Sequence, residues 1–338
     1  MKYNFPKIDL HLHLDGSILP ETAWELAQKE GIVPEGMDFE TFRRESAVLE
    51  PCVDVNDCLA KFELPLQIMQ NGEAVARITR ELICLLAEQG TIYAEIRFAP
   101  QLHMRKGMSQ RDAIEAVLKG REEGLRLHPE IGIGIILCAM SIGPETLNME
   151  ENLETVRLAK EYLGKGVNAL DLAGAEGIVP LWNFHPIFDL AKQLGVPFTC
   201  HGGDSQDMET VRDALDFGSV RIGHGHHIYE DKALCERAMK EGVTFEICPT
   251  SNIRCRSRES YAAHPVKRMF DLGMRVTINT DNMTIFNVDM DEEYDHCLHD
   301  MGFAEEDILQ MLVYAAEAAF LPEEEKRKLV ETVRAYQI

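Results

Sequence analysis

The chain has 338 residues, and its 34 Lys and Arg against 57 Asp and Glu give a formal net charge of -23 at pH 7. This charge repels phosphate backbones and anionic lipid surfaces, so we expect neither nucleic acid nor a membrane as a partner. With 45% hydrophobic and 27% charged residues, the composition is typical of a folded globular protein. The first residues show no signal-peptide pattern, which favours a cytoplasmic location, and the nine cysteines form no C-x-x-C pair that would indicate a zinc ribbon.

Eight short apolar or β-branched runs recur along the chain, each followed by a polar turn and a helical period. The runs span residues 8–12, 91–98, 131–140, 167–172, 196–201, 220–224, 244–248 and 275–279, with amphipathic segments such as 154–163, 186–194, 208–217, 232–241 and 265–272 between them. Alternating strands and helices require parallel strands, and eight such units predict an α/β fold with a closed (β/α)8 TIM-type barrel. An open doubly wound sheet is the alternative, but it usually brings a Gly-rich phosphate loop after the first strand, where this chain has His-Leu-Asp-Gly-Ser.

Two additions account for the length beyond a minimal barrel. The stretch from residue 20 to 90 is long for one connection and predicts a helical insertion after the first strand, in which residues 59–69 are apolar on one face and form a possible lid. The tail from residue 305 to 338 predicts C-terminal helices that close the barrel. We therefore expect residues 1–338 to form a single barrel domain.

Residues of metal-binding type stand at the ends of several predicted strands. His11 and His13 lie on one face at the end of the first strand, and His201, His224 and Asp281 end or follow later strands. Because the carboxyl ends of barrel strands converge, we expect these side chains to meet. Histidine and aspartate ligands with one open position suit a catalytic zinc or a similar divalent ion.

Six ordered motifs carry a resemblance to a known family. They read HLHLDGS at 11–17, DLAG at 171–174, HGGD at 201–204, GHG at 223–225, CPTSN at 248–252 and NTDN at 279–282. In these motifs, and through its whole length, the sequence resembles the adenosine deaminase family of the amidohydrolase superfamily.

The resemblance implies a zinc-dependent hydrolase that converts adenosine and deoxyadenosine, both small purine nucleosides, to inosine and ammonia in purine salvage. His11, His13, His201 and Asp281 would bind one Zn2+ per chain and leave a position for water, whose pKa the metal lowers to about 7. His224 would orient that water and accept its proton. Hydroxide would then attack C6 of the adenine ring while the Asp204 carboxyl protonates N1.

The same resemblance implies contacts with the substrate, each with a structural alternative. Asp15 would bind the 5′-hydroxyl of ribose or cap the next helix. Gly174 would bring its backbone close to purine N3, or is a turn glycine. Asn282 would donate to N7, or is a turn residue. Leu59 and Phe62 would form an apolar gate over the substrate, or belong to the core.

The sequence departs from the family pattern at the catalytic acid. The family usually writes His-Ala-Gly-Glu where this chain has residues 201–204 as His-Gly-Gly-Asp, and the shorter side chain retracts the carboxyl of Asp204 by about 1.5 Å if the backbone stays in place. Two further hypotheses therefore stay open: a related aminohydrolase that acts on another adenine-containing compound, and a nucleoside-binding homologue that has lost turnover. A two-metal amidohydrolase is disfavoured, because the fourth strand ends without a bridging lysine. The pattern does not indicate an oligomeric state.

The sequence also allows predictions for Arg97, His226 and His227. We expect Arg97 to form an ion pair inside the barrel. His226 and His227 are expected to be packing or surface residues and not ligands.

Overall fold

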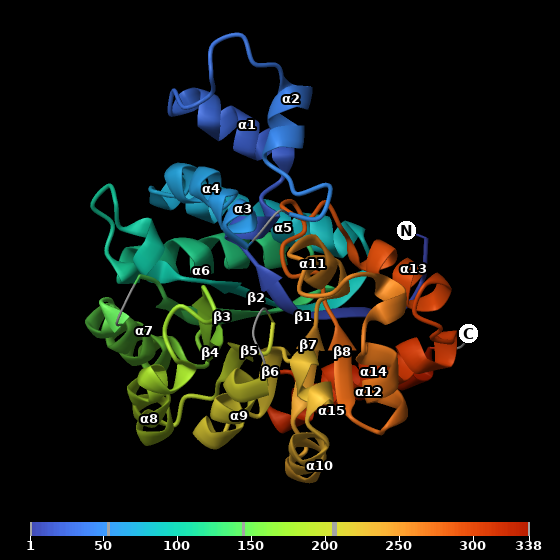
Figure 1. Cartoon of the computed structure of the whole chain (residues 1–338). Helices are drawn as coiled ribbons and strands as arrows, with labels where there is room; N and C mark the ends of the chain where they lie inside the picture. The colour runs from blue at the N-terminus through green and yellow to red at the C-terminus, as the bar shows by residue number, and fades with distance from the viewer. Residues whose placement is uncertain (1, 53–54, 144–145, 205–207, 337–338) are drawn as a thin grey trace.

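The structure is a computed structural model that describes residues 2–52, 55–143, 146–204 and 208–336, of which 55–57 are described by their backbone alone. Parallel strands and helices alternate along the chain, and the helices surround the strands (Figure 1). The strands are β1 (Lys7–His13), β2 (Thr91–Phe98), β3 (Gly132–Ser141), β4 (Val167–Gly174), β5 (Thr199–Gly202), β6 (Arg221–His224), β7 (Thr244–Ile247) and β8 (Arg275–Ile278).

The eight strands form two four-stranded parallel sheets, β1 to β4 and β5 to β8, each in chain order. Isolated parallel bridges join the two sheets on both sides, one between Leu170 and Phe198 and one between Leu12 and Asp281. At the second seam the His13 N–H donates to the Asp281 carbonyl oxygen at 2.7 Å, and the Asp281 N–H donates to the His11 carbonyl oxygen at 2.8 Å. The strands thus follow one another around a (β/α)8 barrel, as predicted.

The helices confirm the predicted alternation and the two additions. They are α1 (Pro20–Lys29), α2 (Phe39–Glu45), α3 (Val55–Ala60), α4 (Glu63–Ile68), α5 (Gly72–Glu88), α6 (Gln110–Leu127), α7 (Met149–Tyr162), α8 (His185–Leu194), α9 (Met208–Phe217), α10 (Lys232–Glu241), α11 (Pro249–Arg254), α12 (Val266–Asp271), α13 (Met290–His299), α14 (Glu305–Ala318) and α15 (Glu323–Ala335). Helices α1 to α5 fill the insertion after β1, and α1 and α2 stand away from the ring in Figure 1. Helices α14 and α15 form the C-terminal addition, whereas α13, between β8 and this tail, was not predicted.

The apolar segment 59–69 is divided between two helices. Helix α3 ends at Ala60, and α4 begins at Glu63 with Pro65 in its first turn. Proline has no backbone N–H and its ring collides with the carbonyl four residues earlier, so it is tolerated in the first turn but not in the middle of a helix. A single helix through Pro65 would break at that residue. A new helix, α4, therefore begins at Glu63, so that Pro65 lies in its first turn.

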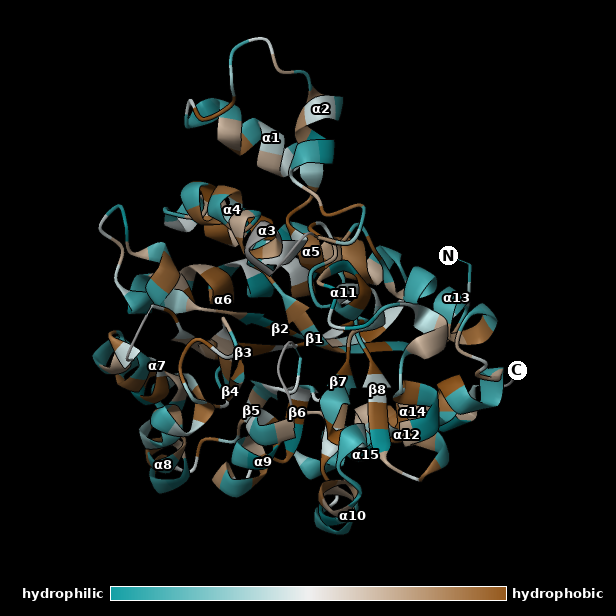
Figure 2. Cartoon of the chain, viewed as in Figure 1, coloured by the Kyte–Doolittle hydropathy of each residue, from teal (hydrophilic) through white to brown (hydrophobic). Residues whose placement is uncertain are grey.

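Charged residues occupy the inside of the barrel. Along β2, Glu95 and Arg97 alternate with the apolar residues Ala94, Ile96 and Phe98, and all five are buried. Since successive side chains of a strand point to opposite faces, the apolar set packs against the helices and the charged set points into the barrel. Figure 2 shows that the outer helices carry both hydrophobic and hydrophilic residues. Helices that pack against the strands on one face and contact water on the other require this division. Across the ranges described above, no helix is both long and apolar enough to cross a bilayer.

Candidate active site

Histidines from three strands meet at the mouth of the barrel. His11 and His13 belong to β1, His201 to β5, and His224 ends β6. The ring centroid of His11 is 4.6 Å from that of His201 and 4.9 Å from that of His224. Asp281, just beyond β8, places its Oδ1 3.5 Å from His11 Nε2 and 3.4 Å from His13 Nε2. The structure therefore brings together the four predicted metal ligands and His224.

The donor atoms of this cluster fit a divalent metal ion. His11 Nε2 is buried without a hydrogen-bond partner in the described part of the chain, and overlapping groups of three ligand atoms lie within 4.8 Å of one another. Burial lowers the pKa of His11 and brings that of His13 well below its usual value, which favours neutral rings. Burial raises the pKa of the Asp281 carboxyl, but the close approach of His11 outweighs it and holds the pKa well below its usual range. Neutral imidazoles with an ionised carboxylate are the ligands that zinc takes.

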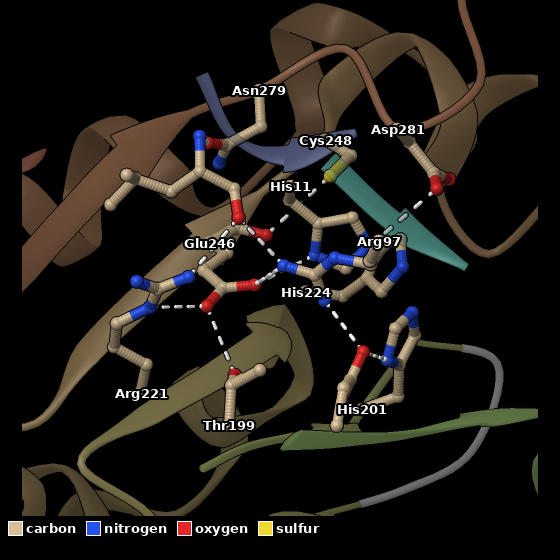
Figure 3. A network of polar contacts seen from close by, with 12 residues as sticks. His11, Arg97, Thr199, His201, Arg221, His224, Glu246, Cys248, Asn279 and Asp281 are labelled. Atoms are coloured by element: carbon tan, nitrogen blue, oxygen red, sulfur yellow. Dashed lines mark hydrogen bonds and ion pairs between the residues drawn. The ribbon is translucent and has the colours of Figure 1, made fainter. Parts of the chain in front are cut away.

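Buried carboxylates orient the two central rings. Glu246 Oε2 lies 2.8 Å from His11 Nδ1, and Asp171 Oδ2 lies 2.9 Å from His201 Nδ1. Burial lowers the pKa of His201, but the charge of Asp171 outweighs it and raises the pKa. Arg97 pairs with both carboxylates at 2.7 Å, which confirms its predicted ion pair (Figure 3). Because Nδ1 of each ring contacts one of these carboxylates, the opposite ring nitrogen, Nε2, faces the cluster.

Two residues of the cluster have strained backbones. His224 has φ 59° and Asp281 has φ 60°, in the left-handed region that residues other than glycine rarely adopt. Both are buried. Such strain costs on the order of 1 to 3 kcal/mol and persists where the surrounding structure enforces it, most often at functional sites.

Asp204, the predicted acid, lies beside His224. Asn252 Nδ2 donates to Asp204 Oδ1 at 2.8 Å, and the same oxygen is 3.5 Å from His224 Nδ1 and 3.8 Å from His226 Nε2. Burial raises the pKa of Asp204, but the charges of His224 and His226 outweigh it and hold the pKa below its usual range. His226 is buried against this carboxylate, whereas His227 pairs with Glu230.

Glu176 holds the backbone of the segment that carries Asp204. Its carboxylate accepts from the N–H groups of Gly203 and Asp204 at 2.6 and 3.1 Å, and from Thr210 Oγ1 at 2.6 Å. A carboxylate that accepts two successive backbone N–H groups restrains the φ and ψ angles between them. Glu176 thus sets the position from which Asp204 reaches into the site.

One cavity of about 460 Å³ opens onto the cluster. His13, His201, Asp204, His224 and Asp281 line it on the metal side. All five predicted substrate contacts also line it, namely Asp15, Leu59, Phe62, Gly174 and Asn282. This volume is within the range of small-molecule sites.

The structure decides between some of the alternatives for these five residues. Asp15 is buried and accepts from the Gly16 N–H at 3.0 Å, while the residue that caps α1 is Leu19, so Asp15 is not the helix cap. Burial raises the pKa of the Asp15 carboxyl to about 6. Gly174 has φ 114°, and a Cβ there would meet the Ser141 carbonyl oxygen at 2.5 Å, so the turn itself requires glycine.

Asn282, Leu59 and Phe62 differ in how deeply they are buried. Asn282 is buried against Gly16, where a Cβ would meet its Oδ1 at 1.7 Å. Leu59 is 38% exposed at the mouth of the cavity, whereas Phe62 is half-buried and packs against a small apolar cluster that includes Phe286. Phe62 therefore belongs both to the core and to the cavity wall.

The sequence interpretation missed four residues that shape the site. Asp171 and Asn252 stand inside motifs quoted above, but only the fold places Asp171 behind the predicted ligand His201 and Asn252 beside Asp204 and His224. Glu246 alternates with apolar neighbours along its strand, which would have indicated a barrel-facing acid. No sequence pattern marks Glu176, because its partners follow 27 and 28 residues later in the chain.

Comparison with known proteins bears on this arrangement. A sequence model of the adenosine deaminase family matches residues 6–336. The chain belongs to the adenosine deaminase family. An adenosine deaminase of Haemophilus ducreyi is 39% identical over 97% of this chain and 95% of its own, and one of Clostridium kluyveri is 36% identical over 96% and 92%. Among solved structures, an Arabidopsis N6-mAMP deaminase matches 98% of both chains with a TM-score of 0.87 and 26% identity.

Proposed function

We propose that the protein is a zinc-dependent adenosine deaminase that hydrolyses adenosine and deoxyadenosine to inosine or deoxyinosine and ammonia. The observation that carries the proposal is the convergence of the His and Asp cluster, Asp204 and His224 on one cavity. The family membership and the curated relatives named adenosine deaminase support the same reaction. We assign one Zn2+ per chain to His11, His13, His201 and Asp281, where it would supply Lewis-acid activation of water.

Asp204 carries the proton transfer in this proposal, and His224 orients the water. His224 orients the attacking water through Nε2, since its Nδ1 accepts from Asn252 at 3.1 Å. Asp204 donates a proton to purine N1, which makes C6 more electrophilic. Because the pKa of Asp204 is held below its usual range, its carboxylate is ionised and first takes this proton from the attacking water. The oxygen adds to C6, its remaining proton goes to the exocyclic amino group, and that group leaves as ammonia.

The remaining residues would bind and enclose the nucleoside. Asp15 accepts from the ribose 5′-hydroxyl, Asn282 donates to N7, and the backbone at Gly174 faces N3. Leu59 and Phe62 cover the base and keep bulk water from the reacting centre. The buried position of Asp15 and Asn282 against the same cavity supports this division of roles.

A related aminohydrolase that acts on another adenine-containing compound is the second candidate. The shorter acid at position 204 favours it, because a 1 Å misplacement of a catalytic group costs about a hundredfold in rate. The similar Arabidopsis structure is described as an N6-mAMP deaminase, which makes N6-methyl-AMP a reasonable test compound. The third candidate, a nucleoside-binding protein without useful turnover, predicts binding and no product.

The test is a spectrophotometric screen of the zinc-loaded protein against adenosine, deoxyadenosine, adenine, AMP and N6-methyl-AMP, with the released amine measured independently. We expect the highest kcat/KM on adenosine or deoxyadenosine. A clear preference for another compound would support the second candidate, and tight binding without turnover the third. Metal analysis should find one zinc per chain, and His11→Ala should lose metal and activity together, with Tm measured to exclude unfolding.

A further inference from the structure

Asn252 connects Asp204, the proposed acid, with His224, which orients the water in the proposed reaction. Its Nδ2 lies 2.8 Å from Asp204 Oδ1 and 3.1 Å from His224 Nδ1. On its other side, Asn252 Oδ1 lies 3.1 Å from Nε2 of His264. Asn252 is fully buried, and the cavity wall includes its neighbour Ser251 but, in the described part of the chain, not Asn252 itself. Its side chain therefore contacts Asp204 and His224 on their sides away from the cavity.

A backbone group sets the direction of these hydrogen bonds. The Val266 N–H donates to His264 Nδ1 at 3.2 Å, so Nδ1 must be an acceptor. Burial brings the pKa of His264 well below its usual value, so the ring is neutral and carries its one hydrogen on Nε2. That N–H donates to Asn252 Oδ1.

The orientation of the Asn252 amide follows from this contact. With Oδ1 facing His264, the two hydrogens of Nδ2 point to the Asp204 carboxylate and to His224 Nδ1. In a flipped amide, Asn252 Oδ1 would face the Asp204 carboxylate, and Nδ2 would face the Nε2–H group of His264. Oxygen would then meet oxygen and donor would meet donor, so the three hydrogen bonds described above would be lost. His264 thus determines which face of Asn252 the catalytic groups meet.

We propose that Asn252, oriented by His264, is a positioning residue that ties Asp204 and His224 into one hydrogen-bonded unit. Glu176 holds the backbone of Asp204 and Asn252 holds its side chain, so the short acid keeps a single position relative to His224. The proposal rests on the proposed function, since it assigns Asn252 to holding the acid Asp204 and the water-orienting His224 in place.

The kinetic test replaces Asn252 by Ala. Both catalytic side chains then lose a donor, and we expect kcat to fall about 10- to 100-fold, as for a misplaced catalytic group. KM should change little because Asn252 lies behind the cavity wall. Asn168→Ala is the matched control: its Nδ2 donates to the Phe320 carbonyl oxygen, far from Asp204, so it should lower Tm without lowering kcat. An Asn252→Ala enzyme with wild-type kcat, or with a change in KM alone, overturns the proposal.

Asn252→Asp separates positioning from packing. The shape is kept, but a second carboxyl now faces Asp204, so the two share a proton and titrate as a pair. We expect the kcat–pH profile to shift and kcat near neutral pH to fall. A purely structural role predicts an unchanged profile at wild-type Tm, which would contradict the proposal.

Two substitutions at position 264 test the orienting contact. His264→Leu removes the donor to Asn252 Oδ1 and should lower kcat, by less than Asn252→Ala. His264→Gln can place an amide N–H where Nε2 was, and should recover most of the activity at the same Tm. If Leu and Gln variants of equal stability have equal kcat, His264 does not act through Asn252.

A double-mutant cycle shows whether Asn252 acts through Asp204. In an Asp204→Asn background the acid is already absent, so Asn252→Ala should lower kcat by a smaller factor than it does in the wild type. Full additivity of the two losses in kcat would contradict a shared unit.

An NMR measurement tests the geometry without turnover. In 15N-histidine-labelled protein, the His264 ring, assigned by its loss in His264→Leu, should be the neutral Nε2–H tautomer from about pH 6 to 8. An Nδ1–H tautomer or a charged ring there overturns the proposal even if the enzyme is active. Absence of deamination with the expected tautomer would instead refute the proposed function and leave the hydrogen-bond geometry intact.

Discussion

Asp204 is the residue at which the chemistry of this chain differs most from the family pattern. An aspartate stands where a glutamate is usual, yet its carboxylate is held by Asn252 and its backbone by Glu176. These contacts hold the shorter side chain and its backbone in place. The position therefore offers two informative substitutions.

We expect Asp204→Asn to bind zinc normally and to lose about 10² to 10⁴ in kcat, the usual worth of a general acid. The amide keeps the size of the side chain but cannot supply a proton that is renewed at each turnover. Metal analysis and kcat on the best substrate check the prediction. An unchanged kcat would remove Asp204 from the mechanism.

For Asp204→Glu we expect lower turnover, because Asn252 and Glu176 already hold the shorter acid and an added methylene would displace its carboxyl. The comparison is kcat/KM for adenosine in wild type and variant at equal zinc content. Higher turnover in the variant would mean that the native acid lies too far from N1.

Glu293 predicts a pH dependence of stability. It is buried in α13, its Oε1 accepts from the Thr250 N–H at 3.0 Å, and burial raises its pKa to about 8. Between about pH 4.5 and 8 the unfolded chain has lost this proton while the folded chain keeps it. Stability therefore falls as pH rises through this window, by at most about 1.4 kcal/mol per pH unit for one proton.

Glu293→Gln removes this titration and keeps the shape. We expect its free energy of unfolding to exceed that of the wild type by more at pH 8 than at pH 5, as measured by urea unfolding at both values. Equal differences at the two pH values would show that Glu293 does not titrate in this window.

At the scale of elements, two cysteines connect the insertion to the barrel. Cys58 in α3 and Cys255, just beyond α11, lie 197 positions apart in the chain, yet their sulfur atoms are 3.1 Å apart and both line the cavity. Cys58 stands next to Leu59 at the mouth. A bond between these sulfurs would fix α3 over the strand ends.

We expect diamide to oxidise the pair, with two thiols giving one disulfide while diamide is reduced to the hydrazine. The cross-link should lower kcat/KM for the nucleoside by restricting α3, and dithiothreitol should restore it. Peptide mapping locates the bond, and Cys58→Ser is the control that should resist inhibition. Inhibition that persists in this variant would place the effect elsewhere.

At the scale of the whole molecule, buried charges connect strands on opposite sides of the barrel. Glu246 of β7 pairs with Arg97 at 2.7 Å and with Arg221 at 2.6 Å (Figure 3). The Arg221 guanidinium also lies over the Phe320 ring at 4.2 Å. Removing one member takes away part of the opposite charge that its buried partners need in a medium of low polarity. The network thus joins the barrel interior, the predicted metal ligand His11 and the C-terminal segment.

Arg221→Met should lower the free energy of unfolding by about 3 to 5 kcal/mol, because buried Glu95 loses its arginine partner and Glu246 keeps only Arg97 of its two arginines. The exposed pair of Arg237 with Asp216 is the control, and Arg237→Met should cost about 0 to 1 kcal/mol. Urea unfolding of both variants gives the comparison. Similar small losses in both would show that the interior network adds little stability.

Local patterns in the sequence determined most of the barrel. Eight strand-helix units, the helical insertion and the C-terminal helices follow from hydrophobic periodicity, which each segment carries by itself. The predicted metal ligands could be read in the same way, since each stands at the end of a strand and parallel strand ends must converge. The break between α3 and α4 was present in the sequence as Pro65 and was missed.

Only the tertiary structure decided how the site is supported. Asp171 and Glu246 behind the histidine rings, Glu176 beneath Asp204, and Asn252 with His264 beside it all act through contacts between distant parts of the chain. Sequence spacing cannot indicate such contacts, because the direction of a buried polar side chain depends on which partner the fold brings within about 3 Å. The sequence alone thus determined which groups could react, and the packing of the barrel decided which groups hold them in place.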